Sequence, residues 1–204
     1  MHWRFWIGAA LVWGPVLSGL LPAAQPAWKA GAARLKITPQ EPLWMAGFAS
    51  RDRPAEGQLH DLWVKILALE SADGHRGVVI TSDLCGISKA TYESVCKELK
   101  TRCGLDRSQI KFTYSHTHSG PALRECLQDY YAWDDAARDR VAQYTLALEK
   151  AIVEKIASAL GNMSDATIWA TEGTADFAVN RRNNDESQID KLLAGGEPLK
   201  GPVD

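Results

Sequence analysis

The sequence lacks several features that mark well-known classes of protein. Its four cysteines include no Cys-x-x-Cys pair, so a structural zinc knuckle is not indicated. Lys and Arg number 23 against 25 Asp and Glu, and a net charge of −2 argues against nucleic acid as a main partner. We find no internal repeat, no low-complexity block, and no nucleophile elbow, phosphate loop or Rossmann fingerprint in a convincing context. Any indication of a catalytic or binding site must therefore come from residues outside these well-known motifs.

The N-terminal residues 1–27 have the pattern of a secretory signal peptide. Arg4 supplies a positive start, residues 5–21 form an apolar run, and residues 22–27 are rich in small residues. A single membrane anchor is the alternative, but the run is short for spanning and contains Pro15. We therefore expect export to a periplasm or beyond, with residues 28–204 forming the mature part.

The remaining composition is that of a globular protein with a real core, because 46% of the 204 residues are hydrophobic and 24% are charged. Export permits disulfides, but their pattern is left open. We disfavour a bridge between Cys96 and Cys103, since seven helical residues separate their α-carbons by about 10 Å.

Hydrophobic periodicity predicts an α/β fold with a mixed sheet and helices packed on it. A helix is expected at 88–103, between an N-cap at Ser88 and a C-cap at Gly104. A long helix should begin after Asp134 or Asp135 and end at Gly161. The chain from 183 onward is polar and without periodicity, which suggests an incomplete domain. Strands are expected at 33–38, 62–70, 76–83, 110–115 and 166–178, the second and third as a hairpin.

The segment Lys111–Pro121 organises the predicted site. It reads Lys-Phe-Thr-Tyr-Ser-His-Thr-His-Ser-Gly-Pro, a strand that ends in two histidines and a turn. The strands 76–83 and 110–115 and the helix between them form a β-α-β unit, whose strands should run parallel. Ligands of open α/β sheets bind at the carboxyl ends of such strands. Asp83, His116 and His118 should therefore meet at one edge of the sheet.

The individual roles stay open at this level. Asp83 either bonds to backbone N–H groups after its strand or orients an imidazole. Further metal ligands would have to come from His60, His75, Asp83 or Glu125, and spacing alone does not assemble a zinc site from them. A surface pair of histidines in a turn is the alternative for His116 and His118.

Aromatic residues in two loops suggest a second kind of function. Apolar residues in the loop 40–58 are expected to pack back on the core, with a substrate cleft as the less favoured role. If they are exposed, the chain could instead be a non-enzymatic exported module that binds a partner or a lipid surface. The residues concerned are Trp44, Phe48, Tyr130, Tyr131 and Trp133.

Several segments resemble the N-terminal catalytic domain of the neutral/alkaline non-lysosomal ceramidases. The resemblance covers residues 29–182, and its most specific element is His116-Thr117-His118-Ser119-Gly120-Pro121. The other matching segments, in the same order and at the same spacing as in that family, are 33–39, Met45-Ala46-Gly47-Phe48, Gly57-x-x-His60 and Thr81-Ser82-Asp83-Leu84.

The resemblance implies a zinc-dependent amidohydrolase that cleaves the N-acyl bond of ceramide or a related lipid, with possible contact to a membrane surface. It implies that His116 ligates zinc, that His118 contacts the substrate near the metal, and that Arg181 binds substrate. The family's other zinc ligands come from segments beyond residue 204. The resemblance thus implies an N-terminal portion of such an enzyme, inactive by itself, or else an inactive truncated remnant.

Overall fold

The computed structural model describes residues 28–174, 178–180 and 182–201, which fall into two compact units, 28–167 and 168–201. The predicted signal peptide, residues 1–27, lies outside this range. Among the described helices none has the length and apolar character needed to cross a membrane. The first unit contains the sheet and the histidine motif, so it contains the site.

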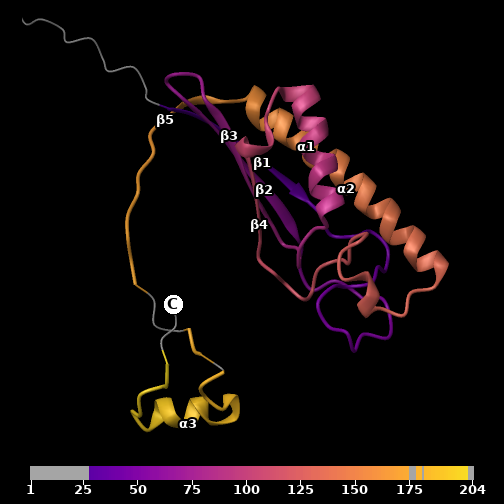
Figure 1. The fold of residues 1–204 in the computed structure, drawn as a ribbon, viewed down its shortest axis with the longest axis vertical. Helices are drawn as coiled ribbons and strands as arrows, with labels where there is room; N and C mark the ends of the chain where they lie inside the picture. The colour runs from indigo at the N-terminus through magenta and orange to yellow at the C-terminus, as the bar shows by residue number, and fades with distance from the viewer. Residues whose placement is uncertain (1–27, 175–177, 181, 202–204) are drawn as a thin grey trace, which may run out of the picture. The chain divides into compact units, whose positions relative to one another are not determined.

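A five-stranded mixed sheet forms the centre of the first unit (Figure 1). The order of the strands across it is β4-β3-β2-β1-β5, with β3 and β4 parallel and every other neighbouring pair antiparallel. The predicted hairpin and the predicted parallel pair are thus both confirmed. The strands are β1 (Trp28–Lys36), β2 (Trp63–Ser71), β3 (Arg76–Ser82), β4 (Ile110–Tyr114) and β5 (Ser164–Ala166).

Two helices, α1 (Lys89–Cys103) and α2 (Asp135–Gly161), cover one face of the sheet (Figure 1). The Ser88 side chain accepts a hydrogen bond from the Thr91 N–H, and Gly104 ends α1 with a left-handed φ of 70°. Asp134 caps α2 in the same way. These caps confirm both predicted helices. Short 3₁₀ turns precede β4 and α2 at η1 (Arg107–Gln109) and η2 (Gln128–Tyr130).

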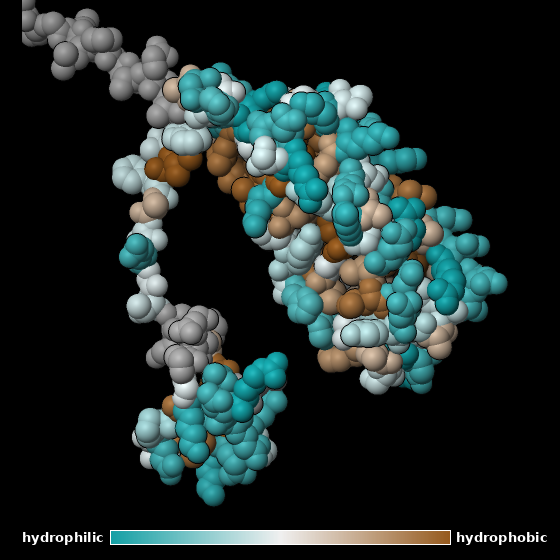
Figure 2. All heavy atoms as spheres, viewed as in Figure 1, coloured by the Kyte–Doolittle hydropathy of each residue, from teal (hydrophilic) through white to brown (hydrophobic). Residues whose placement is uncertain are grey.

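The core lies between the helices and the sheet, and the side chains of β2 show this because they alternate between buried and exposed positions from Val64 to Ala68. Val64, Ile66 and Ala68 are buried against the helices, whereas Lys65 and Leu67 point to the opposite, exposed face. Figure 2 shows mainly hydrophilic residues over the outer side of α2. The inner side of α2 buries a stripe of residues at helical spacing, which are Val141, Thr145, Leu148, Ile152, Ile156 and Ala159.

The strand predicted at 166–178 is wrong. Only β5, residues 164–166, is a strand, and residues 167–174 form none. In the antiparallel register Ala166 pairs with Trp28, the first described residue of β1, so β5 has no further partner among the described residues. A β-prone sequence without a neighbouring strand has nothing to pair with.

The second unit contains a short helix that periodicity did not predict. The turn η3 (Glu186–Gln188) leads into α3 (Ile189–Ala194). The Asp185 side chain accepts a hydrogen bond from the Ser187 N–H, as an N-cap does. The Asn184 amide bonds to the backbone of both Asn180 and Lys200, which closes the unit on itself.

Candidate metal centre

The histidine motif lies at the carboxyl end of β4, directly beside the end of β3. The Ser115 N–H donates to the Ser82 carbonyl at 2.9 Å, which extends the parallel pairing by one residue. The chain then turns at His116, whose φ of 55° lies in the left-handed region that few non-glycine residues adopt. Such local strain often accompanies functional positions.

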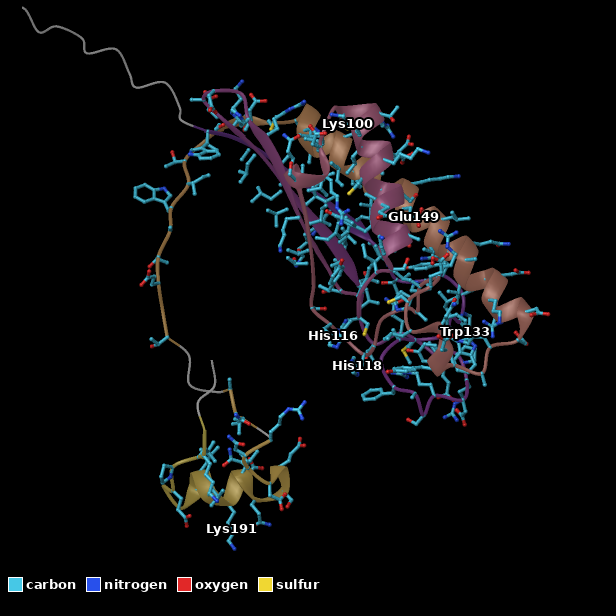
Figure 3. All side chains as sticks on the ribbon, in the orientation of Figure 1. Lys100, His116, His118, Trp133, Glu149 and Lys191 are labelled. Atoms are coloured by element: carbon cyan, nitrogen blue, oxygen red, sulfur yellow. The ribbon has the colours of Figure 1, made fainter. Side chains whose placement is uncertain are left out.

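Three side chains of types that can bind a metal meet at this point, Cys85, His116 and His118. Figure 3 labels the two histidines, which lie close together. One donor atom from each lies within 4.8 Å of the other two. The imidazole centroids are 5.1 Å apart at an interplanar angle of 71°. Cys85 is buried, His118 is half-buried and His116 is exposed, so the cluster opens to solvent on one side.

The backbone fixes the tautomer of His116. Its Nδ1 lies 2.7 Å from the Cys85 carbonyl oxygen. A carbonyl only accepts hydrogen bonds, so Nδ1 must carry the proton. In the neutral ring Nε2 then has a free lone pair, which is the arrangement found in most metal-binding histidines.

The donors suit a zinc ion, because two imidazoles and a thiol are the ligand types that zinc prefers. The Cys85 Sγ lies 3.6 Å from the His116 Nδ1, which is the protonated nitrogen of the ring, so this contact is not itself a pair of metal-binding atoms. Burial raises the pKa of the Cys85 thiol, so without a metal the thiol is protonated at neutral pH. With all three side chains as ligands, one coordination position would stay open for water or substrate. If His118 instead contacts the substrate, as the resemblance implies, this chain supplies fewer than three ligands and the others would have to come from further segments.

A second loop is fastened to the histidine motif by backbone hydrogen bonds. The Ala46 N–H donates to the Gly120 carbonyl at 2.9 Å, and the Ala122 N–H donates to the Trp44 carbonyl at 2.7 Å. This brings the loop between β1 and β2 alongside His118. A pocket of about 440 Å³ lies next to it and shares Ser119, Gly120 and Pro121 with the motif, although neither imidazole lines it.

Asp83 lies at the predicted edge of the sheet, but its carboxylate is used elsewhere. Its Oδ2 accepts a hydrogen bond from the Trp63 N–H at 2.9 Å, which joins the ends of β2 and β3. The carboxylate thus bonds to a backbone N–H group, but one of β2 and not one of the segment after Asp83, so this contact is not the predicted cap. The partner of the His116 imidazole is the Cys85 carbonyl. An orienting role for Asp83 stays a prediction.

We expect Asp83→Asn to separate these two roles. If the carboxylate only holds the backbone, the substitution should lower the free energy of unfolding by about 1–2 kcal/mol. Zinc affinity should then change less than the roughly 10- to 100-fold loss that follows removal of a group that orients a ligand. Urea unfolding and zinc titration of the same variant measure both quantities. A large loss of affinity at unchanged stability would support the orienting role instead.

The other histidines and Glu125 do not join the cluster. His60 is exposed and its Nδ1 lies 3.4 Å from the Asp61 carbonyl, while His75 is exposed and pairs with Asp73. Glu125 forms an ion pair with Arg124. Arg181 lies outside the described residues, so its predicted role is untested.

Cys85 is the member of the cluster that sequence reasoning missed. It follows Asp83 by two residues at the end of β3, the strand parallel to β4. The argument that brought Asp83 and the histidines to one edge applies equally to Cys85. The position of Cys85 shortly after β3 therefore indicates, from the sequence, that it lies near the two histidines.

The loop aromatics are mostly core residues. Trp44, Tyr131 and Trp133 are buried in a second hydrophobic cluster, so the expectation that the loop packs back on the core is confirmed for Trp44. The exposure suggested for these three residues is therefore wrong. Of the five loop aromatics, Phe48 and Tyr130 are the exposed ones, at 52% and 55%. The case for a non-enzymatic module that binds through this set of aromatics is correspondingly weaker.

Comparisons with known proteins agree with this arrangement at the level of the fold. No family model and no curated protein matches the sequence. Solved structures that match include a neutral ceramidase from Pseudomonas aeruginosa (23% identity, TM-score 0.56) and a ceramidase complexed with C2 (22% identity, TM-score 0.55). Each match covers 69% of this chain and 22% of the other one. The chain therefore has the α/β fold of part of a ceramidase and spans about a fifth of the length of those proteins.

Proposed function

We propose that this chain forms the N-terminal, metal-binding portion of a zinc-dependent hydrolase that cleaves the N-acyl bond of ceramide or a related lipid. The observation that carries the proposal is the Cys85, His116 and His118 cluster at the carboxyl ends of two parallel strands. The same segment has the His-Thr-His-Ser-Gly-Pro motif on which the resemblance to ceramidases rests. The structural similarity to neutral ceramidase supports the same reaction class.

In this proposal His116 holds the zinc through Nε2, with Nδ1 fixed by the Cys85 carbonyl. When bound, zinc supplies a water of lowered pKa and polarises an amide carbonyl. His118 lies next to His116 and contacts the substrate, where its imidazole can exchange a proton with the reacting groups. Arg181 would bind the substrate and stabilise the negative charge that develops on the amide oxygen.

The surroundings of the motif support the proposed substrate class. Apolar residues line much of the 440 Å³ pocket beside it, among them Leu43, Met45, Leu62 and Pro121. An acyl chain is the kind of group that such a lining accepts. Export through residues 1–27 would place the enzyme where it meets lipid, and exposed Phe48 is a candidate for contact with a membrane surface.

The proposal predicts metal-dependent hydrolysis by the protein isolated from its source cells. A fluorescent N-acylsphingosine should be cleaved, chelation should lower the rate to the level of buffer, and added zinc should restore it. The 204-residue chain, by contrast, should bind zinc without turnover. Equal rates before and after removal of the metal would contradict the proposed reaction. Failure of the chain to bind zinc would favour a binding module or a remnant.

A further inference from the structure

Three residues of the loop between β1 and β2 enclose His118. Gly47 has a φ of 108°, and a Cβ placed there would overlap the Cγ of His118, so the imidazole lies directly against the Gly47 backbone. The Phe48 ring meets the imidazole edge-on, with centroids 4.7 Å apart and an interplanar angle of 86°. Arg51 donates a hydrogen bond from Nη2 to the His118 carbonyl oxygen. The side chain and the backbone of His118 are thus both held from this loop.

The loop has its own anchors, which do not depend on His118. The Gly47 N–H donates to the hydroxyl of Tyr131 at 2.8 Å, and Tyr131 is buried. Ala46 is bonded to Gly120 through its backbone. A segment fixed in this way can impose a position on a neighbouring side chain.

Arg51 is not used in a surface ion pair. Its guanidinium contacts the His118 carbonyl and lies 5.3 Å from the centroid of Phe48, and its Nε is buried without a hydrogen-bond partner. Arg53, two residues along, instead pairs with Asp52 and Glu56 in the usual way of an exposed arginine. Keeping a cation partly out of water is costly unless its contacts compensate. The contacts of Arg51 lie on the histidine motif and its neighbour.

We propose that Gly47, Phe48 and Arg51 form a clamp that sets the orientation of His118, and that Arg51 is a positioning residue of the site. Gly47 and Phe48 restrict rotation of the imidazole, while Arg51 fixes the backbone two residues after the strained His116. The chemical purpose of the clamp rests on the proposed function, in which His118 must face the substrate. The geometry of the clamp does not depend on that function.

Arg51→Met tests the clamp, because methionine keeps an apolar stem but cannot donate to the carbonyl. Arg51→Lys is the rescue variant, since an ammonium group can make a single charge-assisted hydrogen bond. Arg53→Met is the matched control on the same loop. The measurement is NMR of the zinc-free 204-residue chain, following the nuclear Overhauser effect between the Phe48 and His118 rings and the His118 ring signals. His75, which is exposed in the hairpin turn and pairs with Asp73, supplies the reference for a solvent-exposed ring outside the clamp.

We expect the contact between the Phe48 and His118 rings in the native chain and in Arg53→Met. In Arg51→Met the contact should be lost, and the His118 signals should shift toward those of His75. In Arg51→Lys the contact should return. Phe48→Leu, which keeps an apolar side chain, should also release the imidazole. Urea midpoints verify that each variant is folded. Persistence of the native His118 signals in folded Arg51→Met would overturn the positioning role.

A second measurement separates the clamp from the proposed function. Zinc titration of the native chain tests the metal site by itself, so a clamp seen by NMR without zinc binding would retain the clamp and reject the function. In the hydrolase isolated from its source, Arg51→Met should lower kcat about 100-fold with a much smaller change in KM, because misplacing a reacting group by about 1 Å has an effect of that size. Arg51→Lys should restore most of it. Equal kcat in Arg51→Met and native enzyme would contradict the role of Arg51 in positioning His118 for the reaction, while the NMR result decides the clamp itself.

Discussion

Replacement of His116 is expected to weaken zinc binding by the 204-residue chain at least about 100-fold, since removing a direct ligand should cost more than removing a group that merely orients one. His116 is the ligand whose free nitrogen the structure defines, through the bond from Nδ1 to the Cys85 carbonyl. The variants are His116→Ala and His116→Asn. Asparagine is included because it tolerates the left-handed φ of 55° better than alanine does.

Isothermal titration with zinc, together with metal analysis of the dialysed protein, measures this effect. His75→Ala is the control, because His75 is exposed, pairs with Asp73 in the hairpin turn before β3, and is separated from Cys85 by the length of that strand. Cys85→Ser reports separately on the thiol. Zinc affinity that is unchanged in both His116 variants would remove His116 from the metal site. A loss in His116→Ala but not in His116→Asn would point to backbone strain as its cause.

The largest effect on stability is expected from Gly31→Ala, which should lower the free energy of unfolding by about 2–4 kcal/mol. Gly31 lies in β1 opposite Ala68 and is buried under α2. A Cβ at this position would overlap the Ala159 carbonyl oxygen in the last turn of α2 and crowd Met163. Backbone atoms cannot move aside as the end of a flexible side chain can, so β1 and α2 would have to separate.

Urea unfolding of the 204-residue chain measures this prediction, with the slope of the transition compared between variants. Gly57→Ala is the matched control, because a Cβ added there meets no atom within 4 Å and the φ of Gly57 is not in the left-handed region. The control should remain within about 0.5 kcal/mol of the native chain or be slightly more stable. Equal stability of Gly31→Ala and Gly57→Ala would show that the sheet and α2 are less closely packed than described.

Much of the first unit could be predicted because local signals determine it. Ser88 and Gly104 bound α1 through hydrogen bonds and a left-handed turn that each residue type favours by itself. The parallel pairing of β3 and β4 follows from the helix between them. From the sequence alone, the same connection predicts that Asp83 and the histidines lie at one edge of the sheet.

The errors arose where the outcome depends on distant partners. Residues after Ala166 have strand-forming side chains, but a strand also needs a neighbour, and the register with β1 supplies one only as far as Trp28. The helix α3 has six residues, too few to show a helical period. The burial of Trp44 and Tyr131, and the approach of Arg51 to His118, depend on backbone bonds between loops about 75 residues apart in the sequence, such as Ala46 to Gly120.

The Cys85 carbonyl has a consequence for how the site can vary by mutation. Every amino acid has this carbonyl, so an exchange of the side chain at position 85 leaves the acceptor of the His116 Nδ1 proton in place. The path of the main chain therefore determines which nitrogen of His116 is free to bind a metal, whatever side chain stands at position 85. A thiol at this position can be gained or lost in evolution without reversing the imidazole. Mutation at position 85 can therefore change which atoms are available to bind the metal without changing the orientation of the His116 imidazole.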